Sequence, residues 1–355
     1  MIIGAVNNRR VRILNLRQWI LCVVLLILGL ATLLKSSGRC SKSQPTVNLV
    51  LALTKSKDYS WTSNLTIPKL KVIPFIADDQ RAQFHPPANK GREALTYLTY
   101  LHQFYDSLPG ISIFTHGDDV TWHIDPIFGK STAHALNLLN LDEVLNRGYL
   151  NLRTSWKGGC PAWINTTSSF EGSTGKIFFS KALRGNETMR EKSEEPYMKA
   201  AFEENFLGTK APEVLAQPCC SQFAVSKDTI RSVPRQRYQE KIDWLLKTPL
   251  SDQLTGRIWE HMWQFLFLGE AQDCPRESEA LCRGWRICFE TQVKFDDWNR
   301  LADKVQKLKR EATPEEVNSE EIRRLEVNLN TLRTEAIQRG KARAQEKVKI
   351  TVDLI

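Results

Sequence analysis

The sequence predicts an α/β domain in which a mainly parallel or mixed sheet is flanked by helices. Apolar runs of strand length alternate with segments of helical periodicity throughout 47–290. A charge-free run at 18–34 precedes this domain, and a highly charged stretch at 291–355 follows it. We therefore expect a cytosolic tail at 1–17, a transmembrane signal anchor, a stem at 35–46, the α/β domain, and a helical or partly disordered tail.

Elements within the domain follow from apolar spacing. Val47–Leu53 predicts a buried strand, and 71–77 predicts a second one in which Pro74 favours an edge position or a bulge. From Arg92 the period becomes helical and stops before Pro109, after which a third strand is expected. The third strand and the later ones are expected at 111–115, 149–152 and 220–225, and further helices at 198–206, 235–247 and 254–268.

The apolar run is just long enough for a membrane-spanning helix. Arg9, Arg10, Arg12 and Arg17 precede it, and basic residues favour the cytosolic side. We therefore expect a single-pass type II protein whose domain lies in the lumen of the endoplasmic reticulum or Golgi. A cleaved signal peptide is the alternative, but the run exceeds the usual ~7–15 residues and no A-x-A-like site follows.

Glycosylation sequons agree with a lumenal domain. Asn64, Asn165 and Asn186 each begin an N-x-[ST] sequence, and all three follow the apolar run. We expect these three residues to carry N-linked glycans.

Cysteine usage points to the same oxidising compartment, because seven of the eight cysteines follow the apolar run. Cys274, Cys282 and Cys288 crowd into fifteen residues and predict a stapled loop. Cys219 and Cys220 are adjacent, and we expect each to pair with a distant partner. A zinc site is the alternative, but the chain has no C-x-x-C motif.

The formal net charge of +9 does not point to nucleic acid. Basic residues are spread out, and no stretch interleaves them with aromatic residues on one predicted face. The tail carries short apolar stripes at Leu301–Leu308 and Leu325–Ala336, broken by Pro314. These stripes predict amphipathic helices that pack on the domain or recruit a protein partner.

A dense cluster of ionisable residues follows the third predicted strand. It contains His116, Asp118, Asp119 and His123. Carboxylates with an imidazole can hold Mn²⁺ or Mg²⁺, and such an ion could bridge the diphosphate of a nucleotide sugar. We name His116, Asp118 and Asp119 as candidate metal ligands, Asp119 also as a candidate catalytic residue, and His123 as a ligand-binding residue. The alternative is a polar turn with capping carboxylates.

Two further segments carry candidate site residues. Asn89, Arg92 and Glu93 open the long helix, where free amides favour anions, so we expect them to bind phosphate or sugar. Asn89 can also cap that helix. Glu260 lies among aromatic residues on a predicted helix and is a candidate catalytic base. The structural alternative pairs Glu260 with Arg257, three residues earlier.

Several motifs resemble, in order, an uncharacterised fungal and bacterial family, a domain of unknown function. The resemblance covers 47–288 and excludes the anchor and tail. The family often carries a second His at the position of Asp118. The motifs that carry the resemblance are Asn89-Lys90-Gly91-Arg92-Glu93-Ala94, Tyr105-Asp106, Phe114-Thr115-His116, Trp122-His123, Gly159-Cys160-Pro161, Cys219-Cys220-Ser221-Gln222-Phe223-Ala224-Val225 and Glu260-His261-Met262-Trp263.

The layout of these motifs is similar to that of GT-A type glycosyltransferases, which use nucleotide sugars. This chain and the GT-A enzymes share a strand–helix start, a strand that ends in an acidic cluster, and a later strand before a helix. The resemblance implies a glycosyltransferase-like enzyme that acts on a nucleotide sugar and a glycan acceptor. The alternatives are a non-catalytic anchored module that binds carbohydrate or protein, and a metal-dependent hydrolase that uses His116 and His123.

Overall fold

The computed structural model describes residues 44–167, 192–313 and 319–353. The expected anchor, most of the stem and the sequon at Asn186 lie outside these ranges. In the part of the chain that is described, no helix has the length and apolar character needed to cross a membrane.

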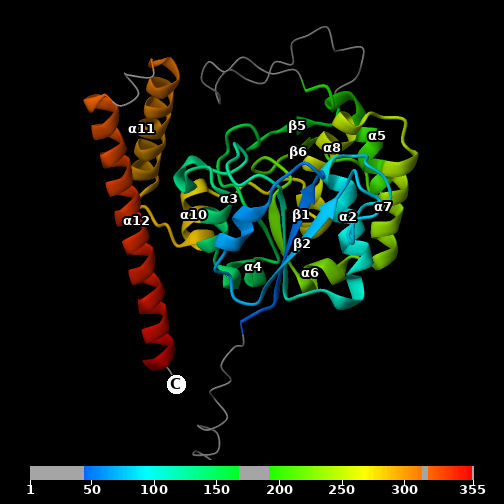
Figure 1. Ribbon diagram of the computed structural model, residues 1–355, viewed down its shortest axis with the longest axis horizontal. Coiled ribbons are helices and arrows are strands. Elements are labelled where there is room, and N and C mark those ends of the chain that lie inside the picture. Colours follow the sequence, from blue (N-terminus) through cyan, green and yellow to red (C-terminus); the bar gives the residue numbers. More distant parts are fainter. Residues whose placement is uncertain (1–43, 168–191, 314–318, 354–355) are drawn as a thin grey trace, which may run out of the picture. The chain divides into compact units, whose positions relative to one another are not determined.

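A mixed five-stranded sheet forms the centre of the domain, as Figure 1 shows. Its strand order is β2-β1-β3-β7-β4. β1, β2 and β3 run parallel, whereas β7 is antiparallel to both of its neighbours. The bounds are β1 Val47–Leu53, β2 Leu70–Ile76, β3 Ile111–His116, β4 Tyr149–Asn151 and β7 Phe223–Ser226. The predicted α/β class is confirmed, and the sheet is the mixed form of the two that were predicted.

Pro74 lies in β2, opposite Leu51 of β1. A proline cannot donate a hydrogen bond to a neighbouring strand, so it is tolerated where one side of the strand is free. β2 is the outermost strand of the sheet on that side. Of the two alternatives predicted for this strand, an edge position or a bulge, the edge position is therefore confirmed.

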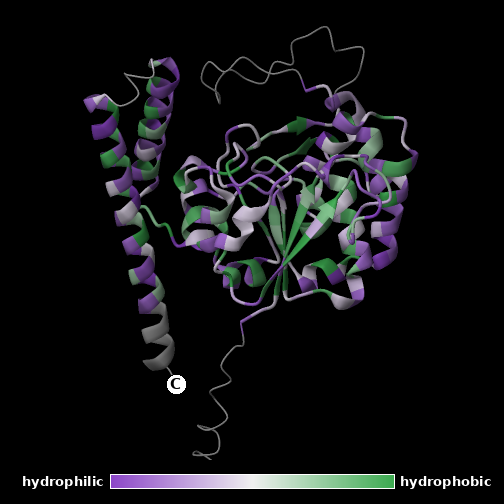
Figure 2. Cartoon of the chain, viewed as in Figure 1, coloured by the Kyte–Doolittle hydropathy of each residue, from purple (hydrophilic) through white to green (hydrophobic). Residues whose placement is uncertain are grey.

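Alternate strand residues face two separate apolar layers. Val50, Phe114 and Phe223 pack with the helices on one face, and Leu49, Ile113 and Ala224 belong to the layer on the other. This alternation follows from the period of two along a strand. Figure 2 shows the apolar colouring concentrated on the strands between the helices.

Helices cover both faces of the sheet. One layer is built mainly by α2 Glu93–Gln103, α7 Arg235–Lys247, α8 Asp252–Glu260 and α9 Trp263–Leu268. The other contains α3 Thr132–Asn137, α4 Leu141–Arg147 and α10 Glu277–Trp285. The remaining elements are η1 Ser60–Asn64, η2 Tyr105–Ser107, η3 Pro126–Phe128, β5 Ile164–Asn165, α5 Glu195–Asn205, β6 Val214–Leu215 and α6 Lys227–Ser232.

The single helix predicted at 254–268 is wrong, because the chain forms α8 and α9 with a break at His261–Met262. Side chains satisfy the carbonyl groups at the break. Gln217 donates to the Glu260 carbonyl at 2.7 Å, and Gln264 donates to that of His261 at 2.9 Å. These contacts replace helical hydrogen bonds, which apolar spacing alone cannot reveal.

The cysteines pair differently from the prediction. Cys160 bonds Cys274 across 114 residues, and Cys282 bonds Cys288 across six. Cys219 bonds Cys220, so the expectation of distant partners for these two was wrong. In the described ranges the other four cysteines are already paired, which leaves the two neighbours for each other. A disulfide therefore staples the end of α10, but it does not include Cys274.

The charged tail is helical at α11 Gln292–Glu311 and α12 Glu320–Asp353. Phe295, Trp298 and Ala336 join the apolar layer that contains α10. The Trp298 indole donates to the Leu329 carbonyl at 3.1 Å, and the Cys288 amide donates to that of Ala336 at 2.9 Å. These contacts attach the helical pair to the domain.

Candidate functional site

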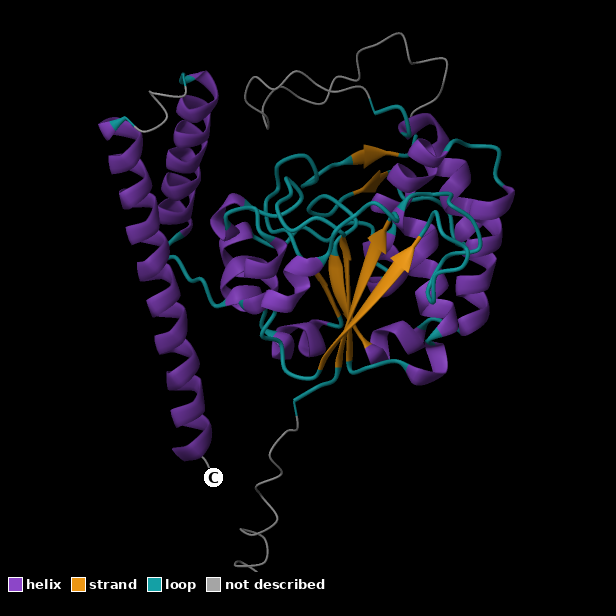
Figure 3. Ribbon diagram, in the orientation of Figure 1, coloured by secondary structure: helices purple, strands orange, loops and turns teal. Residues whose placement is uncertain are grey.

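The candidate site lies beyond the carboxyl ends of β1, β2 and β3. Figure 3 shows loops gathered past the arrowheads of β1 and β2. Because β7 is antiparallel to β3, the segment just before Phe223 reaches the same edge of the sheet. Open α/β sheets bind ligands at this edge.

Two carboxyl groups interact across this edge. Burial and the nearby Glu93 charge raise the pKa of Glu260 to about 8, and Glu194 adds to the effect. Burial likewise raises the pKa of Glu93, although a hydrogen bond from Ser221 and the Arg92 charge partly oppose the shift. Like charges in a poorly solvated place disfavour ionisation of both groups. The Glu260 carboxyl therefore exchanges its proton near neutral pH.

Glu93 is positioned by the start of α2. Gly91 has a φ of +68°, and Arg92 has a φ of 51°, which is uncommon for a residue with a side chain. Glu93 is 7% exposed, and among the described residues its Oε1 atom has no hydrogen-bond partner. An unpaired buried carboxylate oxygen carries a desolvation cost, so this group is available to a ligand or a proton.

Arg92 supplies the positive charge of the site. Its side chain packs on Gly256 of α8, where an added Cβ would meet Arg92 Cδ at 2.8 Å. The Arg92 charge lowers the pKa of Glu93, of Glu260 and of His116. Arg92 therefore acts on both carboxyl groups from the beginning of α2.

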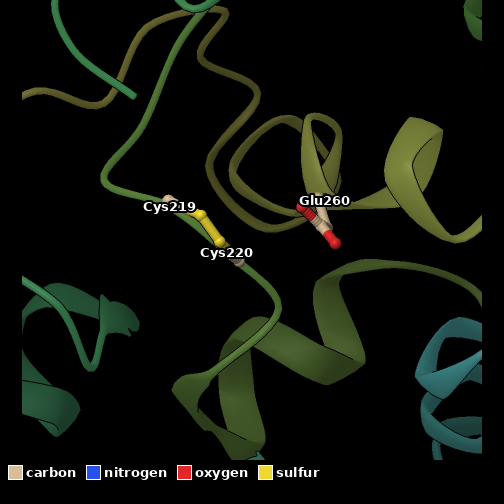
Figure 4. Close-up of side chains that lie close together, drawn as sticks. All are labelled: Cys219, Cys220 and Glu260. Carbon is tan, nitrogen blue, oxygen red and sulfur yellow. A yellow bond between two sulfur atoms is a disulfide. The ribbon is translucent and has the colours of Figure 1, made fainter. Parts of the chain in front are cut away.

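Glu260 lies beside the disulfide between Cys219 and Cys220, as Figure 4 shows. The two sulfur atoms and a Glu260 carboxylate oxygen all lie within 4.8 Å of one another. Across the described ranges this is the one group of three or more His, Cys, Asp or Glu residues with ligand atoms this close. The sulfur atoms are bonded to each other, so they form a wall of the site rather than thiolate ligands.

The rings of His116 and His123 contact each other at a tilt, with centroids 4.3 Å apart. Burial lowers the pKa of His116 to about 4 and, together with the His116 charge, that of His123 to about 3. His123 Nδ1 contacts the Thr121 hydroxyl at 2.8 Å, whereas His116 Nε2 is buried and has no partner among the residues described. Both imidazoles are therefore neutral at neutral pH.

Asp118 and Asp119 contact other groups. Asp118 is about half exposed and forms an ion pair with Lys57 at 2.8 Å. Asp119 Oδ1 accepts hydrogen bonds from the Ser131 hydroxyl at 2.9 Å and the Ala133 amide at 2.8 Å, so it fixes the start of α3. Neither carboxylate belongs to a close ligand group with His116 within the described chain.

Two expected local contacts differ. Asn89 is exposed and does not cap α2, whose N-cap position is occupied by Arg92 without a side-chain hydrogen bond. Arg257 forms an ion pair with Glu194 at 3.4 Å, although its charge also lowers the pKa of Glu260. Arg257, the ion-pair partner expected for Glu260, therefore pairs with Glu194 instead.

Glu194 and His261 form a buried pair that sequence reasoning missed. His261 is 1% exposed and its Nε2 lies 3.2 Å from Glu194 Oε1. Burial alone would raise the pKa of Glu194, but the His261 hydrogen bond and the Arg257 charge lower it to about 2. The sequence gives no spacing signal, because 67 residues separate the two partners.

Two of the three expected glycosylation residues, Asn64 and Asn165, lie in the described ranges. Asn64 is exposed at the end of η1. Asn165 is partly buried in β5, and its side-chain oxygen accepts hydrogen bonds from the Thr167 amide and hydroxyl. The modification of both residues stays a prediction.

A separate cavity of about 450 Å³ lies between α4, α10 and β4. Asn151 and Arg153 belong to its lining, together with Pro218. The Glu93–Glu260 pair is not part of the lining. Asn151 Nδ2 contacts Gln217 Oε1 at 3.4 Å, and Gln217 in turn donates to the Glu260 carbonyl. Gln217 therefore links the cavity wall to the backbone of Glu260.

The fold and this edge define an α/β protein with a polar site of coupled ionisable groups beyond its parallel strands. The family described as Protein of unknown function (DUF3431) matches residues 49–283, and the chain belongs to it. No curated protein and no solved structure matches the chain.

Proposed function

We propose that this protein is a type II, lumenal glycosyltransferase-like enzyme in which Glu260 is the catalytic base. The observation that carries the proposal is the position of Glu260, beside Glu93, at the ligand-binding edge of the sheet. Supporting observations are the strand that ends in an acidic cluster and the strand–helix start, both features of the GT-A layout.

The chemistry requires one proton acceptor. An acceptor hydroxyl attacks the anomeric carbon of a nucleotide sugar, its proton passes to the Glu260 carboxylate, and the bond between the sugar and the diphosphate breaks. A base with a pKa near the working pH is efficient in this role. Arg92 and Asn89, near the start of α2, are proposed to bind the departing diphosphate.

Candidate ligands for Mn²⁺ or Mg²⁺ do not form a coordination set as they are arranged. Asp118 forms an ion pair with Lys57, and one carboxylate oxygen of Asp119 accepts hydrogen bonds from the residues that begin α3. We derive no step through a metal ion. Its involvement stays a prediction, to be tested by assays with Mn²⁺, with Mg²⁺ and with a chelator.

The test uses full-length protein in a non-glycosidic detergent with a panel of UDP- and GDP-sugars. Release of the nucleoside diphosphate is measured in the presence of a mixture of simple glycosides. We expect Glu260→Gln to lower the rate at least ~100-fold, the scale of general-base catalysis. Glu290→Gln, at an exposed position, is the matched control. Turnover that Glu260→Gln leaves unchanged would contradict the assignment of the base.

A non-catalytic carbohydrate-binding module is the second candidate. Trp122 is 62% exposed near the site, and exposed aromatic rings bind the apolar faces of sugars. Saturable sugar binding without any turnover of the donor panel would favour this function. A metal-dependent hydrolase that uses His116 and His123 would instead release free sugar and require the metal ion.

A further inference from the structure

The cavity of about 450 Å³ has the size of a small-molecule site. It lies along the outer side of β4, which is the last strand of the sheet on that side. Residues of α4 and α10 line it as well, and so does Pro218, which precedes Cys219 in the chain. Its location differs from that of the Glu93–Glu260 pair, so it would take a second ligand.

Formal charge in the cavity is balanced. Three guanidinium groups face three carboxyl groups, and they belong to Arg147, Arg153, Arg283, Glu143, Asp273 and Glu279. Arg147 and Asp273 already form an ion pair. An anionic ligand would meet the carboxylates and a cationic one the guanidinium groups, so neither gains a net attraction. A neutral ligand with many hydroxyl groups suits such a lining, because each hydroxyl both donates and accepts.

Arg153 forms an ion pair with Asp125 that leaves part of its hydrogen-bonding capacity unused. Its side chain is 11% exposed, and its Nε lies 3.5 Å from Asp125 Oδ1. Nε and Nη1 are buried and make no hydrogen bond within the described part of the chain. Buried donors without acceptors carry a desolvation cost.

An aromatic surface adjoins the same arginine. The Arg153 guanidinium carbon lies 5.7 Å from the ring centroid of Trp122, which is 62% exposed. The loop that carries Trp122 is held in place, because the Thr121 amide donates to the Lys130 carbonyl at 2.9 Å. A pyranose that covered the indole with its C–H face would remove apolar surface from water.

We propose that this cavity, with Trp122 beside its Arg153 wall, binds a neutral saccharide. Its role as the acceptor site rests on the proposed transferase function, whereas saccharide binding itself does not. Gln217 accepts a hydrogen bond from Asn151 of the lining and donates one to the backbone carbonyl of Glu260, so it links the cavity wall to the backbone that carries the proposed base.

Ligand-observed NMR on the full-length protein tests the proposal. The probes are the methyl glycosides of glucose, mannose and galactose, with glucuronic acid and glucosamine as charged comparisons. Ala280→Trp fills the cavity from α10, and Ala342→Trp places the same side chain at an exposed position of α12 outside the lining. We expect at least one neutral glycoside to saturate the wild type and Ala342→Trp but not Ala280→Trp. Trp122→Ala should weaken its binding about 10-fold, and Trp122→Phe should restore most of it.

Three results would overturn the inference: no binding of any neutral glycoside, preference for a charged sugar, or equal binding to Ala280→Trp. The two proposals can fail separately. Saccharide binding that Ala280→Trp abolishes, in a protein without transferase activity, leaves the cavity assignment intact. Transferase activity with an unchanged acceptor KM in Ala280→Trp refutes the acceptor role of the cavity alone.

Discussion

Replacement of Glu260 by glutamine should change how stability depends on pH. The folded protein holds the pKa of Glu260 near 8, against about 4.5 for the free group. The folded state therefore binds more protons than the unfolded state between these values, and stability must fall as pH rises through the interval. At about 1.4 kcal/mol per pKa unit, the loss between pH 4.5 and 7.5 is on the order of 3–4 kcal/mol.

Glutamine resembles the protonated carboxyl group and cannot ionise, so Glu260→Gln should escape this loss. We expect the variant and the wild type to be about equally stable at pH 4.5. At pH 7.5 the variant should be more stable, with a Tm roughly 7–14 °C higher for a domain of this size. Thermal or urea unfolding at several pH values, followed by circular dichroism, measures the difference.

The matched control is Glu290→Gln, which removes an exposed carboxylate and should follow the wild-type pH dependence. Equal pH slopes for the wild type and Glu260→Gln would refute the reasoning, because they would mean that Glu260 ionises normally in the folded protein. If Glu260→Gln shows this stability profile but keeps full transferase activity, the raised pKa of Glu260 is supported and its role as the catalytic base is refuted.

Other predictions concern the loop, the disulfides and the tail. Asp119→Ala should lower the free energy of unfolding by about 1–2 kcal/mol in urea titrations, because the start of α3 loses a hydrogen-bond acceptor. Asp118→Ala should change it by less than about 1 kcal/mol, because the ion pair of Asp118 is exposed. Removing the Cys160–Cys274 disulfide in a double alanine variant should lower the free energy of unfolding by about 4–5 kcal/mol, because the disulfide closes a loop of 114 residues. Peptide mapping of the unreduced wild type should recover these two cysteines in one linked product. Separate free peptides would contradict the pairing. Gly340→Leu should detach α12, because an added Cβ would collide with a backbone carbonyl of the domain, and limited proteolysis should then cut the tail faster than in the wild type.

The sequence predicted the strands well where apolar runs are bounded by breakers. β1 coincides with the predicted Val47–Leu53, and α7 coincides with the predicted 235–247. Predictions failed where long-range contacts terminate elements. The break between α8 and α9 depends on Gln217, which is 43 residues from the carbonyl that it contacts. The short helices α3 and α4 were missed, because six or seven residues carry too little periodicity to be recognised.

Candidate site residues separate into two groups. The structure brings Arg92, Glu93 and Glu260 into one set of interacting charges, with His123 and His116 adjoining it. The two carboxylates after β3 make other contacts: Asp118 pairs with Lys57, and Asp119 accepts hydrogen bonds at the start of α3. Sequence reasoning could select carboxylates beyond a strand end, but it could not find where their side chains point.

From the sequence alone follow the α/β class, an edge position or a bulge for the proline-bearing strand, and a family without an assigned activity. These properties depend on apolar periodicity and backbone chemistry, which are determined by residues close together in the sequence. The tertiary structure alone decided that Glu93 and Glu260, 167 positions apart in the chain, share one poorly solvated place beside a disulfide of adjacent cysteines. A proton affinity depends on the distance between charges and on their access to water, and both quantities exist only after the chain has folded.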